Sequence, residues 1–286
     1  MHQPLRYAYN TNGCTNHRLS DALRLMADAG YDGVALTLDW HHLDPFAADW
    51  KEQARKLRGE LGGYGLGCVI ETGARYLLDP AHKHQPTLLH PTPEGRQRRV
   101  DFLQRAVDIG AILEAETVSC WSGIQPPSLT RSEAHQYLVE GLVRVADYAS
   151  ARGVSLSLEP EPGMLIERNA DYEALLGSHP ALQQHLRLAL DLGHVWVTGE
   201  SAPDTAITQY VHRLGTVSIE GMARGVHHHL PLHEGDMAIP PLLAALKAVA
   251  FRGLICVELS RESPRAHLAI PESIQLLQAL EREINS

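Results

Sequence analysis

Short apolar runs recur along the chain at near-regular intervals, and each has the length of one buried β-strand. Runs of five to seven residues rich in Leu, Val, Ile and Cys are typical of strands covered on both faces, as in a parallel sheet. Eight strands are predicted in this way, and they begin at Leu5, Gly33, Gly67, Glu116, Val154, Leu186, Gly215 and Gly253.

Between these runs, apolar residues recur every three or four positions, which is the period of an amphipathic helix. Clear examples are residues 19–30, 101–113, 134–153 and 239–253. Eight alternating strand–helix units predict an α/β protein, and a single (β/α)8 TIM barrel is the simplest arrangement with that count. A doubly wound open sheet is the alternative, but no GxGxxG motif follows the first strand, as a dinucleotide fold would require.

Length and composition agree with one barrel. The chain has 286 residues, close to the roughly 250 of a typical eightfold barrel. No linker or low-complexity tract divides it, so one domain is predicted over residues 1–286. The longest irregular segment, residues 72–95, follows the third strand, and a loop of that length is typical of a lid or binding loop.

The charge balance restricts the class of partner. The formal net charge is −9, and an acidic surface repels nucleic acid and anionic lipid, so neither partner is expected. No apolar stretch approaches the ~20 residues of a membrane span, and the first residues lack the apolar region of a signal peptide. We therefore expect a cytoplasmic protein with a small-molecule partner. The oligomeric state is open, and a homo-oligomer is compatible with the sequence.

Four carboxylates stand at or near the ends of consecutive strands: Glu159, Asp191, Glu220 and Glu258. An unpaired carboxylate at a buried strand end costs several kcal/mol to desolvate. The carboxyl ends of barrel strands converge on one site, so the four side chains are predicted to surround a divalent cation. For any one of them, a salt bridge or a helix N-cap is an equal alternative.

The predicted donor set decides which cations are expected. Oxygen ligands favour Mn²⁺ or Mg²⁺, and neighbouring histidines also admit Co²⁺, Fe²⁺ or Zn²⁺. His194 lies three residues beyond Asp191, where it can reach over a bound substrate. His227 and His229 belong to a histidine triplet after the seventh strand and are also candidate substrate ligands, although a solvated loop is the alternative.

Further candidate substrate contacts follow earlier strands. Trp121 after the fourth strand and Trp40 after the second could stack on a sugar face, with core filling as an equal alternative. Glu71, Arg75 and Lys83 lie at or after the end of the third strand. Arg75 and Lys83 together could recognise a phosphate or carboxylate, but without a Gly-rich phosphate cradle a surface pair is the simpler interpretation.

The order of the motifs LEPEP, DLGH, HLPLHEGD and VEL resembles the xylose isomerase-like barrel superfamily. That superfamily includes sugar epimerases of the tagatose/psicose 3-epimerase kind, inosose-processing enzymes and, more distantly, endonuclease IV. The resemblance implies a divalent metal held by Glu159, Asp191, a seventh-strand residue and Glu258. In the epimerase branch the two glutamates also exchange protons with the substrate carbon from opposite faces, so Glu159 and Glu258 are the implied catalytic pair.

The seventh strand departs from the family pattern. The family usually has His-x-Lys-Asp there, whereas this chain has Ser218-Ile219-Glu220-Gly221. Glu220 is two residues beyond Ser218 and therefore shares its face of the strand, so it is the expected substitute for the missing histidine. His227 or His229 is the next choice.

These observations predict a divalent-metal-dependent isomerase or epimerase. Its substrate would be a sugar, sugar phosphate or cyclitol ketone, and protons would move through a metal-stabilised enediolate. A lyase or dehydratase of the same superfamily would share that step. An endonuclease IV-like phosphodiesterase is disfavoured, because it needs Asp-x-His where this chain has Gly225-Val226-His227. A metal-free binding barrel would leave the clustered negative charge without compensation.

Overall fold

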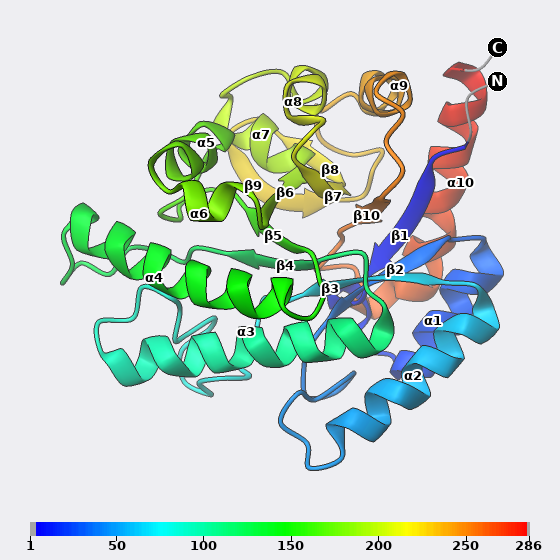
Figure 1. Cartoon of the computed structure of the whole chain (residues 1–286). Coiled ribbons are helices and arrows are strands. Elements are labelled where there is room, and N and C mark those ends of the chain that lie inside the picture. The colour runs from blue at the N-terminus through cyan, green and yellow to red at the C-terminus, as the bar shows by residue number, and fades with distance from the viewer. Residues whose placement is uncertain (1–3, 285–286) are drawn as a thin grey trace.

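Eight parallel strands close into a barrel in the computed structural model, which describes residues 4–284 (Figure 1). Their order around the barrel is β1-β10-β7-β6-β5-β4-β3-β2. Their bounds are β1 Arg6–Asn10, β2 Gly33–Thr37, β3 Gly67–Glu71, β4 Val118–Trp121, β5 Leu156–Glu159, β6 Leu186–Asp191, β7 Leu214–Ile219 and β10 Leu254–Val257. The predicted (β/α)8 barrel is confirmed, and every strand begins within two residues of its predicted start.

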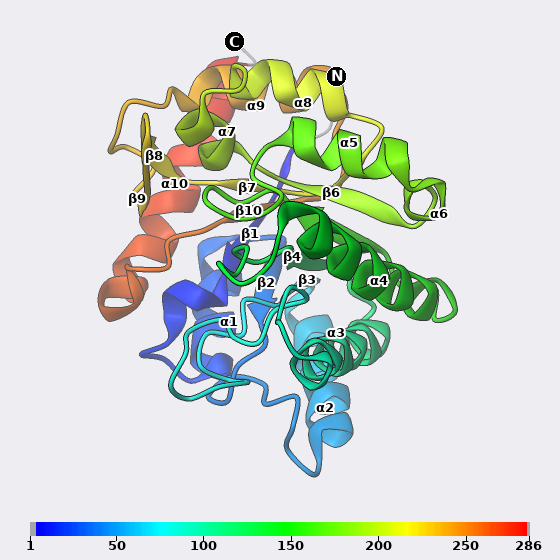
Figure 2. The ribbon, with the colours of Figure 1, turned by 90° about the vertical axis from the view of Figure 1, so that its left-hand side faces the viewer.

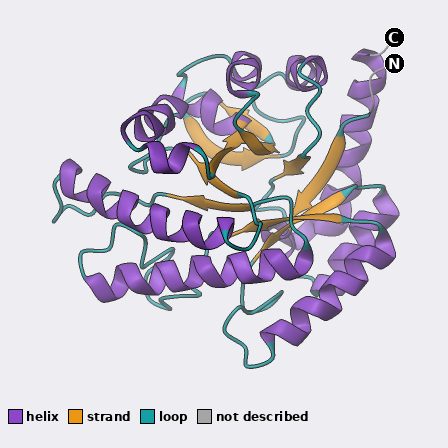
Figure 3. Ribbon diagram, viewed as in Figure 1, coloured by secondary structure: helices purple, strands orange, loops and turns teal. Residues whose placement is uncertain are grey.

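Helices surround the barrel on its outer side (Figures 2 and 3). Their bounds are α1 Leu19–Ala29, α2 Trp50–Tyr64, α3 Pro93–Leu113, α4 Arg131–Ser150, α5 Asn169–Ser178, α6 Pro180–Gln183, α7 Leu192–Thr198, α8 Pro203–Tyr210, α9 Ile239–Ala248 and α10 Ala266–Ile284, with short 3-10 helices η1 Thr11–Cys14 and η2 Ser263–Arg265. Helix α3 begins earlier than predicted because Thr92 accepts a hydrogen bond from the Gly95 amide and Pro93 occupies the first helical position. The irregular segment after β3 therefore ends at residue 92, not 95.

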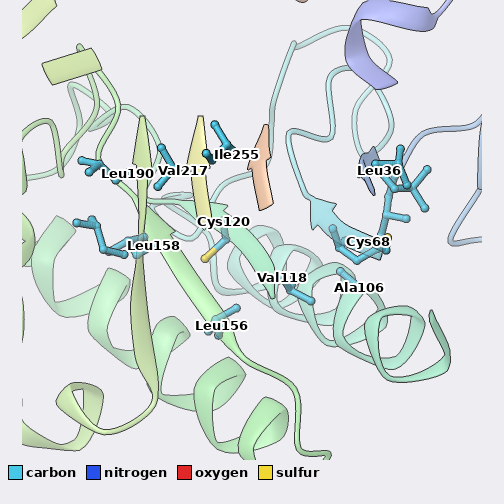
Figure 4. Close-up of a cluster of buried hydrophobic side chains, with 14 of the residues drawn as sticks. Leu36, Cys68, Ala106, Val118, Cys120, Leu156, Leu158, Leu190, Val217 and Ile255 are labelled. Carbon is cyan, nitrogen blue, oxygen red and sulfur yellow. The ribbon is translucent and has the colours of Figure 1, made fainter. Parts of the chain in front are cut away.

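Strand parity separates the two faces of the barrel wall. Alternate side chains point outward and pack with the helices, as Val118 of β4 does in the cluster that also holds Ala106 of α3 (Figure 4). The other parity points inward, where Ala8, Val69 and Cys256 belong to a separate small cluster. The inward parity continues from Val69 to Glu71 and from Cys256 to Glu258. Because of this alternation, Glu71 and Glu258 face the interior at the carboxyl end of the barrel.

A hairpin that the sequence pattern did not predict follows β7. It consists of β8 (Gly221–Ala223) and β9 (Val226–Leu230), which pair antiparallel across a two-residue turn. The strand β8 is short and β9 is rich in histidine, so neither has the apolar pattern used to identify strands. This hairpin carries His227 and His229.

None of the helices in residues 4–284 is both long and apolar enough to cross a membrane. A cytoplasmic location, the oligomeric state and the one-domain boundary stay predictions. Residues 1–3 and 285–286 of the predicted domain lie outside the described residues.

The close approach of the segment at Gly235 to strand β8 can be tested by comparing alanine substitutions at two glycines. Gly225 and Gly235 both have positive φ, +72° and +83°, but only at Gly235 would a Cβ meet backbone, 2.4 Å from the Met222 oxygen. We expect Gly225→Ala to cost about 1 kcal/mol for the left-handed conformation alone. Gly235→Ala should cost about 3 kcal/mol, because steric overlap is added. Urea unfolding measures both, and equal losses would contradict the close approach.

Candidate metal and substrate site

A cavity of about 520 Å³ opens at the carboxyl ends of the barrel strands. A site of that size suits a small organic molecule. Most of the predicted site residues line it: Glu71, Arg75, Lys83, Trp121, Glu159, His194, His227, His229 and Glu258. The other two predicted residues, Asp191 and Glu220, are buried and lie outside its lining. The cavity thus brings most of the predicted residues together, although many of its other lining residues were not predicted.

Four glutamates give the cavity its negative charge. Glu71 and Glu159 are the last residues of β3 and β5, Glu258 directly follows β10, and Glu161 lies two residues beyond Glu159. Burial and neighbouring acids raise the pKa of Glu71 and of Glu159 well above the usual range. Burial, Glu258 and Asp191 raise the pKa of Glu161 to about 8. Without a cation, Glu71, Glu159 and Glu161 favour the protonated form, because burial and neighbouring acids disfavour their charge.

The two carboxylate oxygens of Asp191 have different environments. It caps helix α7, because its Oδ1 accepts a hydrogen bond of 2.8 Å from the His194 amide. Its Oδ2 is buried and has no hydrogen-bond partner among the described residues. That oxygen lies 3.7 Å from Nε2 of His194, which also lacks a partner within residues 4–284.

His194 has the protonation state that a metal ligand needs. Burial lowers its pKa to about 4, although Asp191 opposes that shift, so the imidazole is neutral near pH 7. Its Nδ1 lies 3.1 Å from the Pro160 carbonyl oxygen. Because a carbonyl can only accept, Nδ1 carries the proton and Nε2 keeps a free lone pair. Glu159 Oε1 lies 3.6 Å from the same ring.

The hairpin brings two more histidines against His194. The centroid of the His194 ring is 4.7 Å from that of His227 and 5.9 Å from that of His229. Three groups of side chains have candidate ligand atoms within 4.8 Å of one another, and His194 or Asp191 belongs to each: His194 with His227 and His229, Glu159 with Asp191 and His194, and Asp191 with Glu220 and His229.

Glu220 lies behind Asp191 and outside the cavity wall. It is fully buried, and neither carboxylate oxygen has a hydrogen-bond partner in the described part of the chain. It packs so closely on helix α7 that a Cβ at Gly193 would lie 1.8 Å from its Oε1. Burial and the nearby charge of Asp191 raise its pKa well above the usual range. Its role as the substitute ligand stays a prediction, and His229 shares its group.

Glu258 lines the cavity but belongs to none of the three groups found within residues 4–284. Its Oε1 accepts a hydrogen bond of 2.8 Å from Nδ2 of Asn12, which follows β1. This contact comes from the segment after β1, the strand that pairs with β10, and it orients the carboxylate. A role at the substrate therefore fits Glu258 at least as well as a role as a metal ligand.

The buried atoms fit a divalent cation. Asp191 Oδ2, His194 Nε2, His229 Nδ1 and both Glu220 oxygens have no partner among the described residues. Each unsatisfied buried polar atom costs about 1–3 kcal/mol, so a cluster of them is unusual unless a ligand satisfies it. All are carboxylate oxygens or imidazole nitrogens, which are ordinary ligands of divalent transition metals.

Trp121 forms an aromatic part of the cavity wall. The guanidinium of the buried Arg99 lies 4.4 Å from its ring centroid, and His84 meets it edge-on at 5.5 Å. Arg99 is fixed in turn by donating to the Thr72 carbonyl at 2.8 Å. The indole is therefore held from two sides. Trp40 is 71% exposed and does not line the cavity, so the hypothesis that it stacks on the substrate there is not supported.

Several cavity residues were missed from the sequence, among them Asn12, Glu161 and Arg261. Each of these three stands within four residues of a strand end, so the rule applied to the strand-end acids would have found them had it been extended to every strand and every polar residue. Glu161 was also visible as the second acid of the LEPEP motif.

The chain belongs to the family of xylose isomerase-like TIM barrels, and the match to that family covers residues 23–280. A search of curated proteins finds no match.

Solved structures of similar fold include several sugar epimerases. An L-ribulose 3-epimerase has 19% sequence identity and a TM-score of 0.77, with 99% of this chain and 96% of that chain covered. The IolI protein, solved with a bound zinc atom, has 15% identity and a TM-score of 0.79, with 98% and 99% covered. D-allulose 3-epimerase from Methylomonas sp., solved with D-allulose, has 20% identity and a TM-score of 0.73, with 98% and 99% covered. At these identities the likeness establishes the fold.

The repulsion among the cavity acids predicts a pH-dependent effect of metal. Because its pKa is raised, Glu161 holds more proton in the metal-free native state than in the unfolded chain between about pH 4.5 and about pH 8. The contribution of Glu161 to the free energy of unfolding should therefore fall as pH rises through that window. A bound cation replaces those protons, so the rise in Tm produced by Mn²⁺ should be larger at about pH 8 than at about pH 5. Scanning calorimetry with and without chelator measures this, and equal shifts at both pH values would contradict it.

The missing seventh-strand ligand can be identified by substitution. We expect Glu220→Ala and His229→Ala each to weaken metal binding by about 10–100-fold, the range for residues that hold a metal directly or through another ligand. His233→Ala, which removes an exposed histidine downstream of the hairpin, is the matched control. Isothermal titration of Mn²⁺ into protein that a chelator has freed of metal measures the affinities. If Glu220→Ala keeps the wild-type affinity while His229→Ala loses it, the ligand is His229 and the assignment to Glu220 is wrong.

Proposed function

We propose that this protein is a divalent-metal-dependent isomerase or epimerase acting on a sugar, a sugar phosphate or a cyclitol ketone. The observation that carries the proposal is the placement of Glu159 and Glu258. They reach one cavity from β5 and β10, which β6 and β7 separate in the barrel wall. Two carboxylates that approach a small molecule from different sides can remove a proton on one face and return one on the other.

The reaction needs a base next to a carbon that is alpha to a carbonyl. Glu159 and Glu258 take this role in alternation, one accepting the proton and the other donating it. The hydrogen bond from Asn12 fixes the direction of the Glu258 carboxylate. Glu159, Asp191 and His194 would hold a divalent cation, which would supply Lewis-acid stabilisation for negative charge on the substrate oxygens.

Other cavity residues bind and orient the substrate. His227 and His229 line the cavity and can hydrogen-bond to hydroxyl oxygens, while the fixed Trp121 ring offers an apolar surface to the carbon face of a sugar.

The donor set also favours certain metals. Imidazole nitrogens mixed with carboxylates suit Mn²⁺, Fe²⁺, Co²⁺ and Zn²⁺, whereas Mg²⁺ prefers oxygen ligands alone. The zinc atom bound to the IolI protein and the D-allulose bound to the Methylomonas epimerase support a metal and a ketose for this chain. Mn²⁺ is therefore the first cation to test, with Zn²⁺ and Mg²⁺ beside it.

Exchange of substrate hydrogen with solvent tests the proposal. The protein loaded with Mn²⁺ is incubated in deuterium oxide with ketoses, inososes and their phosphates, and NMR and mass spectrometry follow the deuterium. Glu159→Gln and Glu258→Gln should lower the exchange rate by about 10²–10⁴-fold, the usual contribution of a general base. Glu140→Gln, an exposed residue of α4, is the matched control and should keep the wild-type rate.

The product distinguishes the proposal from its alternative. An isomerase or epimerase keeps the mass of the substrate apart from deuterium, whereas a lyase or dehydratase of the same family loses water or a fragment. Wild-type exchange in both glutamine variants would refute the assigned roles.

A further inference from the structure

Three cations line the same cavity as the acids. Arg75 and Lys83 belong to the segment after β3, and Arg261 belongs to the segment after β10. None of the three forms an ion pair with a carboxylate of residues 4–284. This is unexpected in a chain of net charge −9, whose cavity alone offers four glutamates as partners.

The acids and the cations occupy different levels of the cavity. Glu71 and Glu159 are the last residues of their strands, and Glu159 is only 8% exposed. Lys83 and Arg261 are exposed and lie on the loops beyond the strand ends. Glu71 and Glu159 therefore lie at the floor of the cavity, and the exposed Lys83 and Arg261 lie toward its mouth.

Arg75 is held in place without being neutralised. Its Nη2 donates a hydrogen bond of 2.9 Å to the backbone oxygen of Asn12, whose side chain donates to Glu258. The other guanidinium donors have no partner in the described part of the chain. Asn12 therefore contacts both Arg75 and Glu258, and it fixes the position of the one relative to the other.

The positive charge of these side chains affects the pKa of the neighbouring His84. Burial, together with Lys83, Arg99 and Arg75, lowers the pKa of His84 to about 4, although its hydrogen bond to the Gly73 carbonyl opposes the shift. This shift agrees with a positive potential on this side of the cavity.

We propose that the substrate carries an anionic group, a carboxylate or a phosphate, which Arg75, Lys83 and Arg261 bind at the mouth while its polyol end reaches Glu159 and Glu258. This assignment rests on the proposed function, since it names the substrate class of that site. Arginine binds carboxylate and phosphate through paired N–H donors, and lysine adds a point charge. A neutral sugar would leave all three cations unmatched.

Binding of unreactive ligands tests the assignment without any proton transfer. Sorbitol, gluconate and sorbitol phosphate share a polyol chain and differ in the charged end, so titration calorimetry of the Mn²⁺-loaded protein isolates the effect of that charge. We expect at least one anionic ligand to bind about tenfold or more tightly than sorbitol, the scale of hydrogen bonds to charged groups. The tighter of the two anionic ligands identifies carboxylate or phosphate as the group recognised.

Substitutions identify which cationic side chain causes the preference for an anionic ligand. Arg75→Ala and Arg261→Ala should each remove most of the preference for the anionic ligand, and Arg75→Lys should restore part of it by keeping the charge. Arg55→Ala, an exposed arginine of α2, is the matched control and should change nothing. If sorbitol binds as tightly as the anionic ligands, or if the preference survives in the double variant Arg75→Ala/Arg261→Ala, the proposal is overturned. The second result would mean that the anion binds elsewhere, such as on the metal.

Deuterium exchange with fructose, fructose phosphate and fructuronate separates this proposal from the proposed function. Faster exchange with an anionic ketose, lost in Arg75→Ala, supports both. Equal exchange with all three leaves the isomerase proposal intact and refutes the anionic substrate. Arginine-dependent binding of the anionic polyols without exchange into any ketose supports charge recognition and counts against the isomerase.

Discussion

Mutual repulsion among buried carboxylates is the constraint on which this site depends. Glu71, Glu159, Glu161 and Glu220 all have raised pKa values because the barrel places them out of water and near one another. A fold tolerates such a concentration of charge only when protons, a cation or both reduce it. The neutral His194 and the unpartnered oxygen of Asp191 stand where a cation would do so.

The barrel itself could be predicted in detail, because a parallel strand covered on both faces leaves a strong signal in the sequence. The runs at Gly33, Gly67 and Leu186 begin at the very residues where β2, β3 and β6 begin. Strand-end acids could be predicted for the same reason, since parity and position decide which residues face the barrel end. Glu159 and Asp191 end β5 and β6, and Glu258 directly follows β10, whereas their roles stay predictions.

What the sequence could not provide was the arrangement beyond the strand ends. The β8–β9 hairpin is held by Asp236, which accepts from the Arg224 amide and donates to the Met222 oxygen, and not by an apolar pattern. The hairpin decides where His227 and His229 lie. Glu220 has the parity expected of a ligand, yet it follows the end of β7 and packs behind Asp191. Loop cations such as Arg261 carry no periodic signal at all.

Asp191 caps helix α7 with one carboxylate oxygen and leaves the other without a partner among the described residues, which bears on the affinity for the proposed metal ion. Because the cap on α7 already locks the rotamer of this side chain, its freedom is lost when the chain folds. Little further entropy is then spent when Oδ2 meets an incoming ion, which is the advantage of preorganisation. One oxygen of this carboxyl group thus stabilises the start of α7, and the other is left available to the proposed ion.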